Sequence, residues 1–134
     1  MQRLNVAAAA LNQTPLDWDG NRDRILRAIE MARNAGATML CLPELCITGY
    51  GCEDAFQSPD VQERAIDVLR EIEPETEDLI VSAGLPVMYN SALYNATALL
   101  VDGAVAGVVA KRNLAGDGVH YEPRWFKPWP DEHR

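Results

Sequence analysis

A run of six apolar-leaning residues, bounded by a glycine and a proline, sets the architecture of the first third of the chain. Residues 37–42, Ala-Thr-Met-Leu-Cys-Leu, follow Gly36 and stop at Pro43. A continuous run of this length fits a strand that is covered on both faces, whereas a half-exposed strand would alternate between apolar and polar residues. We therefore expect this strand to lie inside a layered α/β fold.

A strand and a helix are expected before this run. Residues 3–10 predict a short buried strand, and residues 20–35 carry apolar side chains at helical spacing. Ile25 and Ile29 belong to one apolar stripe, which is typical of an amphipathic helix with one face on a core. Gly36 occupies the position of a left-handed helix C-cap. The order strand, helix, strand is that of an α/β domain.

The rest of the chain predicts a second helix followed by β-structure. Ser58-Pro59-Asp60 combines an N-cap, a proline at the first helical position and an acid in the first turn. The acidic segment 74–78 ends this helix and is expected to be a solvated connection. Asp102-Gly103 is the strongest hairpin signal in the chain. The strands expected here are 79–84, 93–101 and 104–110, and residues 112–134 predict irregular structure. The runs 79–84 and 104–110 are nearly continuously apolar, so we expect them to be buried on both faces.

Length and charge exclude several classes of protein. The 134 residues fit one domain of ordinary size, and 48% of them are hydrophobic, so a core is possible. Twelve basic against twenty acidic side chains give a net charge of −8, which repels phosphate backbones. No apolar run approaches the ~20 residues that a membrane span needs. We expect neither nucleic acid nor a membrane as a partner.

Cysteine usage points to a reducing compartment. Cys41, Cys46 and Cys52 are an odd number of thiols within twelve positions, so they cannot all pair with one another. Their spacing also lacks the C-x-x-C pattern of a zinc site. We therefore expect a reduced, cytoplasmic protein without a metal, in which Cys41 belongs to a buried strand and all three cysteines serve packing.

Two charged residues stand where chemistry is often found. Glu44 follows a predicted core strand, and Lys111 ends the apolar run 104–110. The carboxyl ends of core strands are where open α/β sheets build their sites. Each residue could equally mark a strand end that meets water, and the two could form a structural ion pair. A phosphate-binding loop and a G-x-S-x-G elbow do not occur in the sequence.

The residues around both charges resemble a known family. Residues 42–54, Leu-Pro-Glu-Leu-Cys-Ile-Thr-Gly-Tyr-Gly-Cys-Glu-Asp, look like the first signature of the nitrilase, or carbon–nitrogen hydrolase, superfamily. The part Thr-Gly-Tyr-Gly-Cys-Glu-Asp resembles, more narrowly, the glutaminase domain of glutamine-dependent NAD synthetases. Residues 111–126, beginning Lys-Arg-Asn-Leu and ending Tyr-Glu-Pro-Arg-Trp-Phe, are similar to the lysine segment of that family. The resemblance extends over residues 3–126.

This resemblance implies a site of the Glu-Lys-Cys type. Glu44 matches the general base, which deprotonates the cysteine nucleophile and later the hydrolytic water. Lys111 matches the cation that faces the tetrahedral oxyanion. Glu122 matches a second glutamate that orients the lysine and the substrate. Tyr50 matches an aromatic residue that lines the glutamine pocket.

The same resemblance implies the wider organisation. Residues 1–126 would be the N-terminal portion of an α/β domain, part of a nitrilase-like α-β-β-α sandwich, with residues 127–134 as an irregular tail. Glutamine would be the substrate, and the released ammonia would amidate deaminated NAD on an ATP-dependent synthetase domain that this sequence does not include. The glutaminase step needs no cofactor, and a homo-oligomer is expected.

The sequence departs from the family pattern at three points. The family nucleophile lies farther beyond the lysine than the 23 residues that follow Lys111, and none of the three cysteines occupies its place. Asp117 stands six positions after the lysine, where the family has an aromatic residue of the substrate pocket. His120 likewise replaces an aromatic residue; it and His133 are the only histidines.

Other interpretations stay open from sequence alone. The chain could be a fragment of a different amidase or carbamoylase of the same superfamily. It could be a binding or regulatory module that keeps the scaffold without catalysis. It could also be a truncated product without a function of its own.

Overall fold

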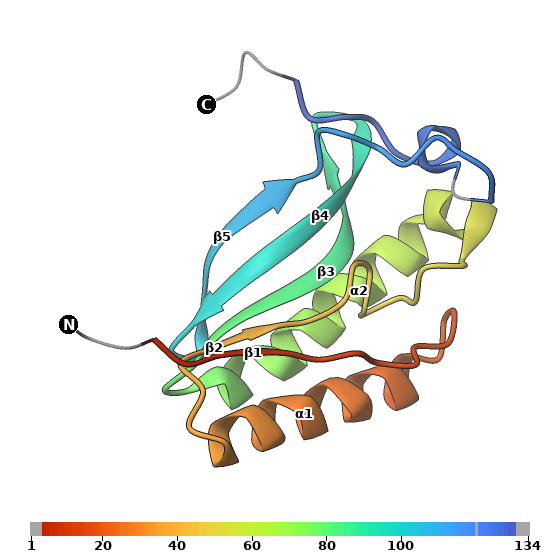
Figure 1. The fold of residues 1–134 in the computed structure, drawn as a ribbon. Coiled ribbons are helices and arrows are strands. Elements are labelled where there is room, and N and C mark those ends of the chain that lie inside the picture. The colour runs from red at the N-terminus through yellow and green to blue at the C-terminus, as the bar shows by residue number, and fades with distance from the viewer. Residues whose placement is uncertain (1–3, 120, 131–134) are drawn as a thin grey trace.

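Two parallel strand pairs and two antiparallel pairs build one mixed sheet, with helices against it (Figure 1). The structure is a computed structural model that describes residues 4–119 and 121–130. Its strands are β1 (Val6–Ala8), β2 (Met39–Cys41), β3 (Ile80–Tyr89), β4 (Ala92–Val101) and β5 (Ala104–Ala110), in this order across the sheet. Its α-helices are α1 (Trp18–Asn34) and α2 (Pro59–Ile72), and three short 3₁₀ segments cover Glu53–Gln57, Glu73–Thr76 and Glu122–Arg124.

The order predicted from the sequence is confirmed, with shorter first strands. The expected strands 3–10 and 37–42 contain β1 and β2 of three residues each, which pair in parallel. Gly36 follows α1 with a φ of +70°, the left-handed conformation that a helix C-cap requires. Ser58 precedes α2 as expected, although its side chain makes no capping hydrogen bond.

A hairpin between β3 and β4 was not predicted. β3 continues past the expected end at residue 84 to Tyr89, and β4 returns after Asn90 and Ser91, whose φ values of +46° and +62° are those of a tight hairpin turn. Pro86 lies in this strand. A proline in the sequence is evidence against a central strand, because it has no N–H group to donate to a neighbouring strand. The strand tolerates it because β2 pairs only with the first three residues of β3, so Pro86 lies beyond that ladder.

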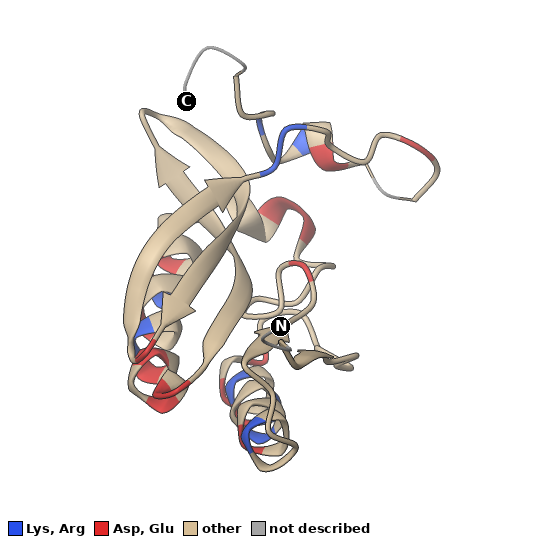
Figure 2. Ribbon diagram, turned by 60° about the vertical axis from the view of Figure 1, so that its left-hand side comes forward, with Lys and Arg blue, Asp and Glu red and all other residues tan. Residues whose placement is uncertain are grey.

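One face of the sheet is covered and the other is open. Leu40, Val81, Ala83 and Leu100 point toward α1 and α2 and form the main core with apolar side chains of both helices. Because side chains alternate along a strand, their neighbours point to the opposite face. None of the five strands contains Asp, Glu, Lys or Arg, and Figure 2 shows the charged residues on the helices and loops.

Several expectations about burial are wrong. Residues 3–10 were expected to form a buried strand, but Val6 of β1 is 63% exposed because it points to the open face. The strand 37–42 was expected to be covered on both faces, but only one face of β2 is covered. We expected the strand 104–110 to be buried on both faces, but β5 is exposed along its length, with Val109 70% exposed, because it is the edge strand and neither helix covers it. We also expected the segment 74–78 to be solvated throughout. Thr76 is buried there, and its Oγ1 accepts a hydrogen bond from the amide of Gly103 at 3.2 Å, which joins the segment to the β4–β5 turn.

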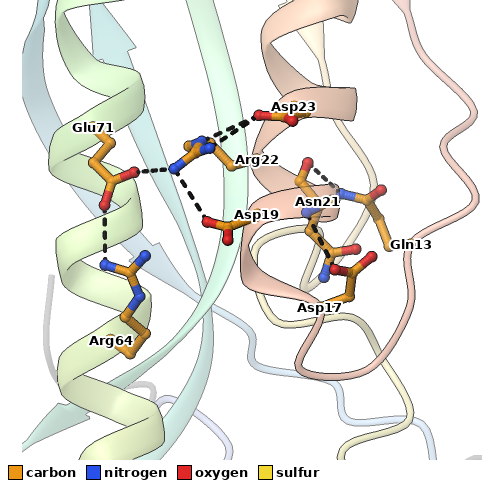
Figure 3. Close-up of polar contacts among 9 residues, drawn as sticks. Gln13, Asp17, Asp19, Asn21, Arg22, Asp23, Arg64 and Glu71 are labelled. Carbon is orange, nitrogen blue, oxygen red and sulfur yellow. Dashed lines mark hydrogen bonds and ion pairs between the residues drawn. The ribbon is translucent and has the colours of Figure 1, made fainter.

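An arginine joins the two helices at the surface (Figure 3). The guanidinium of Arg22 on α1 donates to Glu71 on α2 at 2.8 Å and to Asp23 at 3.1 Å. Arg64 also donates to Glu71, at 3.0 Å. Exposed pairs of this kind contribute about 0–1 kcal/mol each, so they orient the helices more than they stabilise the fold. No described helix is both long and apolar enough to cross a membrane.

A buried amide supports the loop that follows β2. Asn21 on α1 is fully buried, and its Nδ2 donates to the carbonyl of Ile47 at 3.2 Å and to that of Thr14 at 2.8 Å. Gln13, drawn beside it in Figure 3, donates from Nε2 to the carbonyl of Cys46 at 2.7 Å. Buried polar groups of this kind are stable only when they are paired. The loop that carries Glu44 is therefore fixed from the helix side.

Candidate active site

The carboxylate of Glu44 is held at a sharp turn after β2. Leu45, the next residue, is fully buried and has a φ of +49°, a left-handed conformation that is costly for a residue with a branched side chain. The turn brings the chain back across β3, where the amide of Ile47 donates to the carbonyl of Gly84 at 3.2 Å. Buried contacts on both sides thus compensate for the strained backbone beside Glu44.

Gly84 on β3 makes room for this turn. A Cβ atom at Gly84 would collide with the backbone nitrogen of Leu45 and would lie 3.0 Å from the carbonyl carbon of Glu44. Real Cβ atoms do not approach backbone atoms this closely. Glycine is therefore required here because the backbone of the Glu44 turn lies directly on the sheet.

Lys111 reaches Glu44 from the edge strand β5, whose carboxyl end lies at the same end of the sheet as that of β2. It follows β5, and its backbone amide donates to the carbonyl of Asn95 on β4 at 2.8 Å, which continues the ladder by one residue. Its Nζ lies 2.7 Å from Oε1 of Glu44, and the two side chains are 31% and 41% exposed. The sequence placed both charges at strand ends, and the fold brings these ends together over 67 residues of sequence.

Glu122 completes a triad of charged groups. It is fully buried, and Nζ of Lys111 lies 2.9 Å from its Oε2. The amide of Ala115 donates to the same oxygen at 2.6 Å, and the hydroxyl of Tyr50 donates to Oε1 at 3.0 Å. A buried carboxylate needs several donors of this kind to stay ionised.

The surroundings keep these groups in defined charge states. Burial opposes the ionisation of Glu122, but hydrogen bonds from the Ala115 amide and from Lys111 outweigh it and hold the pKa of Glu122 below its ordinary value. Burial also lowers the pKa of Lys111, yet its two carboxylate partners leave this pKa above its ordinary value. Burial and the adjacent Glu122 raise the pKa of Tyr50, so its phenol remains a donor.

Asn95 is a member of this cluster that sequence reasoning missed. It lies in the middle of β4 and is 3% exposed. Its Nδ2 donates to Oε1 of Glu44 and, at 3.1 Å, to Oε1 of Glu122. The sequence signal was available, since an asparagine inside the apolar run 93–101 is out of place for a strand. Only the fold shows which groups it meets.

An open cavity of ≈430 Å³ borders the cluster on the uncovered face of the sheet. Glu44, Asn95 and Lys111 line it together with Cys41, Leu42, Ser82, Thr97, Val109 and Ala110. Tyr50 is not among these residues; it packs against a second apolar cluster around Phe56 and contacts Glu122. The structure therefore brings Glu44, Lys111, Glu122 and Tyr50 together, but neither Tyr50 nor Glu122 lines the cavity.

The three cysteines differ in their surroundings. Cys46 and Cys52 are buried, and burial raises the pKa of both thiols, that of Cys46 to about 12. They serve packing, as expected. The expectation that Cys41 is buried is wrong: it is exposed because it points to the uncovered face, where the hydroxyl of Ser82 lies 3.3 Å from its sulfur.

A second contact fixes the segment that carries Glu122. The guanidinium of Arg124 donates from Nε and Nη2 to the two oxygens of Asp54, each at 2.8 Å. The indole of Trp125 donates to Asp54 at 3.0 Å. Arg124 and Trp125 lower the pKa of Asp54 to about 2, so the pair stays charged through the neutral range. The contact joins the loop after Glu44 to the segment around Glu122.

Within residues 4–119 and 121–130, no group of three or more His, Cys, Asp or Glu side chains is arranged to hold a metal ion. Asp117 is exposed, while His120 and His133 lie outside the described residues. The chemistry available in the described cluster is that of a carboxylate and an ammonium group at the border of a cavity. A carboxylate can take a proton, and a fixed ammonium can stabilise a developing negative charge.

A comparison with protein families decides the relationship. The family model described as carbon–nitrogen hydrolase matches residues 5–132. The chain belongs to the carbon–nitrogen hydrolase family. The mixed sheet that positions the cluster is thus the fold of a carbon–nitrogen hydrolase.

Its relatives are much longer proteins. The chain is 39% identical over 130 residues to the glutamine-dependent NAD(+) synthetase of Homo sapiens, covering 96% of this chain and 18% of that protein. A crystal structure of a glutamine-dependent NAD(+) synthetase from Cytophaga hutchinsonii is 51% identical with a TM-score of 0.94, covering 97% of this chain and 22% of that one. The enzyme from Acinetobacter baumannii, solved with ADP, is 27% identical with a TM-score of 0.90, covering 98% and 25%. The chain therefore spans about a fifth to a quarter of these relatives.

Proposed function

We propose that this chain carries the general base and the oxyanion-stabilising cation of a glutamine-hydrolysing site, in a glutamine-dependent NAD synthetase. The observation that supports this most is the contact of 2.7 Å between Nζ of Lys111 and Oε1 of Glu44, at the border of an open cavity. The relatives named above support glutamine as the substrate, since they are glutamine-dependent enzymes.

The chemistry follows from what amide cleavage needs. Glu44 takes the proton of a cysteine thiol, and the thiolate attacks the side-chain carbonyl carbon of glutamine. The electron pair of that carbonyl moves to its oxygen, and Lys111 stabilises the resulting oxyanion. Collapse of the intermediate expels ammonia, with Glu44 returning the proton. Glu44 then activates the water that hydrolyses the thioester and releases glutamate.

The remaining roles belong to the same proposal. Glu122 and Tyr50 hold Lys111 from the protein side, with Tyr50 also near the glutamine pocket. Residues 1–126 form the N-terminal portion of the glutaminase domain, and 127–134 an irregular tail. The ammonia serves an ATP-dependent synthetase domain that amidates deaminated NAD, while the glutaminase step itself uses no cofactor. We further propose a cytoplasmic homo-oligomer, on the basis of three unpaired cysteines and an uncovered sheet face.

A chimeric enzyme tests the proposal directly. Residues 5–130 replace the matching segment of the Cytophaga hutchinsonii synthetase, whose fold is nearly the same over this region. The chimera is expected to release ammonia from glutamine. Glu44→Gln should lower the rate of this release by about 10²–10⁴-fold, and Lys111→Met by about 10²–10³-fold. Synthesis of NAD from free ammonia should stay largely unchanged in both variants.

Matched variants separate chemistry from folding. Lys127→Met changes the other lysine of the chain, which is exposed, and Glu30→Gln changes an exposed carboxylate on α1. Both should keep the glutaminase rate of the chimera. Near-normal ammonia release by Glu44→Gln or Lys111→Met would show that the residue takes part only in a structural ion pair and not in catalysis. Turnover of another amide but not of glutamine would indicate a different amidase of the family.

A further inference from the structure

The two oxygens of Glu44 have different surroundings. Oε1 accepts hydrogen bonds from Nζ of Lys111 and from Nδ2 of Asn95. Both of these donors therefore lie at the same oxygen. Glu44 lines the cavity and its side chain is 41% exposed, so the carboxylate is anchored through Oε1 and remains accessible from the cavity.

Asn95 is suited to impose this difference. An ionised carboxylate only accepts hydrogen bonds, so the amide must turn its NH₂ group, with two donors, toward Glu44 and Glu122. If the side-chain amide were flipped, its carbonyl oxygen would face the two carboxylates, and none of these groups could donate a hydrogen bond. Asn95 is 3% exposed inside β4, and its backbone carbonyl accepts a hydrogen bond from the backbone amide of Lys111. The position of the residue is therefore fixed by the sheet.

The same amide separates two negative groups. Glu44 and Glu122 both contact Nζ of Lys111, so one positive charge faces two carboxylates. Without further donors, like charges this close favour protonation of one of them. Asn95 gives each carboxylate one hydrogen bond without adding a charge.

We propose that Asn95 is a positioning residue, which anchors Oε1 of Glu44 against Lys111 and leaves Oε2 as the atom that accepts the proton. This inference rests on the proposed function and deepens it, because it names the reacting atom of the base. It also gives Asn95 a second effect, which is to hold two carboxylates beside one ammonium group without adding a charge of its own.

Variants of Asn95 in the chimera test both effects. Asn95→Leu removes the two donors, and Asn95→Asp keeps the shape while adding a negative charge. Both should lower kcat for ammonia release by about 10²-fold, with little change in KM, because a misplaced catalytic group affects the reaction more than binding. The acidic limb of the pH profile should move to higher pH, farther for Asn95→Asp, because a lost donor and an added negative charge both favour the protonated carboxyl.

Controls separate this role from a structural one and from failure of the proposed function. Asn34→Leu makes the same exchange at an exposed asparagine at the end of α1, away from the cavity, and it should leave kcat and the acidic limb unchanged. Synthesis from free ammonia and the thermal melt report whether each variant folds. If Glu44→Gln abolishes ammonia release but both Asn95 variants keep the normal kcat and pH profile, the positioning role is overturned. If Glu44→Gln has no effect, the proposed function itself fails.

Discussion

Each thiol near the Glu44 turn meets different surroundings, and these decide its reactivity. Cys46 lies 3.7 Å from the carbonyl of Gly84 and is fully buried, and burial raises the pKa of its thiol to about 12, so the thiol stays protonated in the neutral range. Cys52 is buried against the carbonyls of Thr48 and Gly49. Only Cys41 lines the cavity that Glu44 and Lys111 border.

We predict that residues 1–134 alone do not hydrolyse glutamine. Glu44 and Lys111 can assist an attack, but Cys46 and Cys52 are too deeply buried to make one. The measurement is ammonia release by the purified chain with glutamine, compared with buffer. The competing possibility is attack by Cys41: turnover that is lost on alkylation and in Cys41→Ser, but retained in Cys52→Ser, would make Cys41 the nucleophile.

At the scale of elements, the site depends on the contact between the Glu44 turn and β3. We predict that Gly84→Ala destabilises the fold by about 1–3 kcal/mol, because the new methyl group must push the turn away from the sheet. Displacing Glu44 in this way should also lower ammonia release by the chimera about 10²-fold. Thermal unfolding and kcat/KM are the measurements.

Gly107 on β5 provides the matched control. It is a strand glycine like Gly84, but a Cβ atom there would meet nothing within 4 Å. Gly107→Ala should therefore keep both the melting temperature and the rate. Equal losses in the two variants would show that β-strand glycines matter here for a reason other than the Glu44 turn.

The elements show what the sequence could predict and what it could not. Local patterns predicted both helices and the Asp102-Gly103 hairpin, because capping residues and turn residues act over a few positions. They did not predict the turn at Asn90, which lacks the glycine of a strong hairpin signal. The left-handed backbone of Leu45 was equally hidden, since it depends on the contact with β3 rather than on local preference.

For the site as well, the sequence predicted some residues, whereas others became evident only from the fold. The sequence placed Glu44 and Lys111 at the ends of strands, and their contact is a fact of the fold. The resemblance to a family supplied Glu122 and Tyr50, which the fold brings into hydrogen-bond contact. Asn95 was not predicted, because its partners lie 51 and 27 residues away in the sequence and only the register of β4 brings them together.

At the scale of the whole molecule, charge and apolar surface are segregated. The helices and loops carry the charged residues behind the net charge of −8, whereas the sheet presents an uncharged face (Figure 2). On that face, Val6 of β1 is 63% exposed and Val109 of β5 is 70% exposed. Exposed apolar strands at the edges of a sheet favour pairing with a second chain.

We therefore predict that residues 1–134 expressed alone are oligomeric, poorly soluble or only partly ordered. Repulsion between the charged faces opposes association, but it acts on the helix side and leaves the open face free to pair. Size exclusion with light scattering and a thermal melt on the same sample measure this. Val109→Lys should shift the protein toward monomer, because a lysine on an edge strand disfavours edge-to-edge pairing, whereas Met31→Lys, at an exposed position on α1, should not. A 14.8 kDa monomer with one cooperative transition would instead show that this sheet face is stable in water.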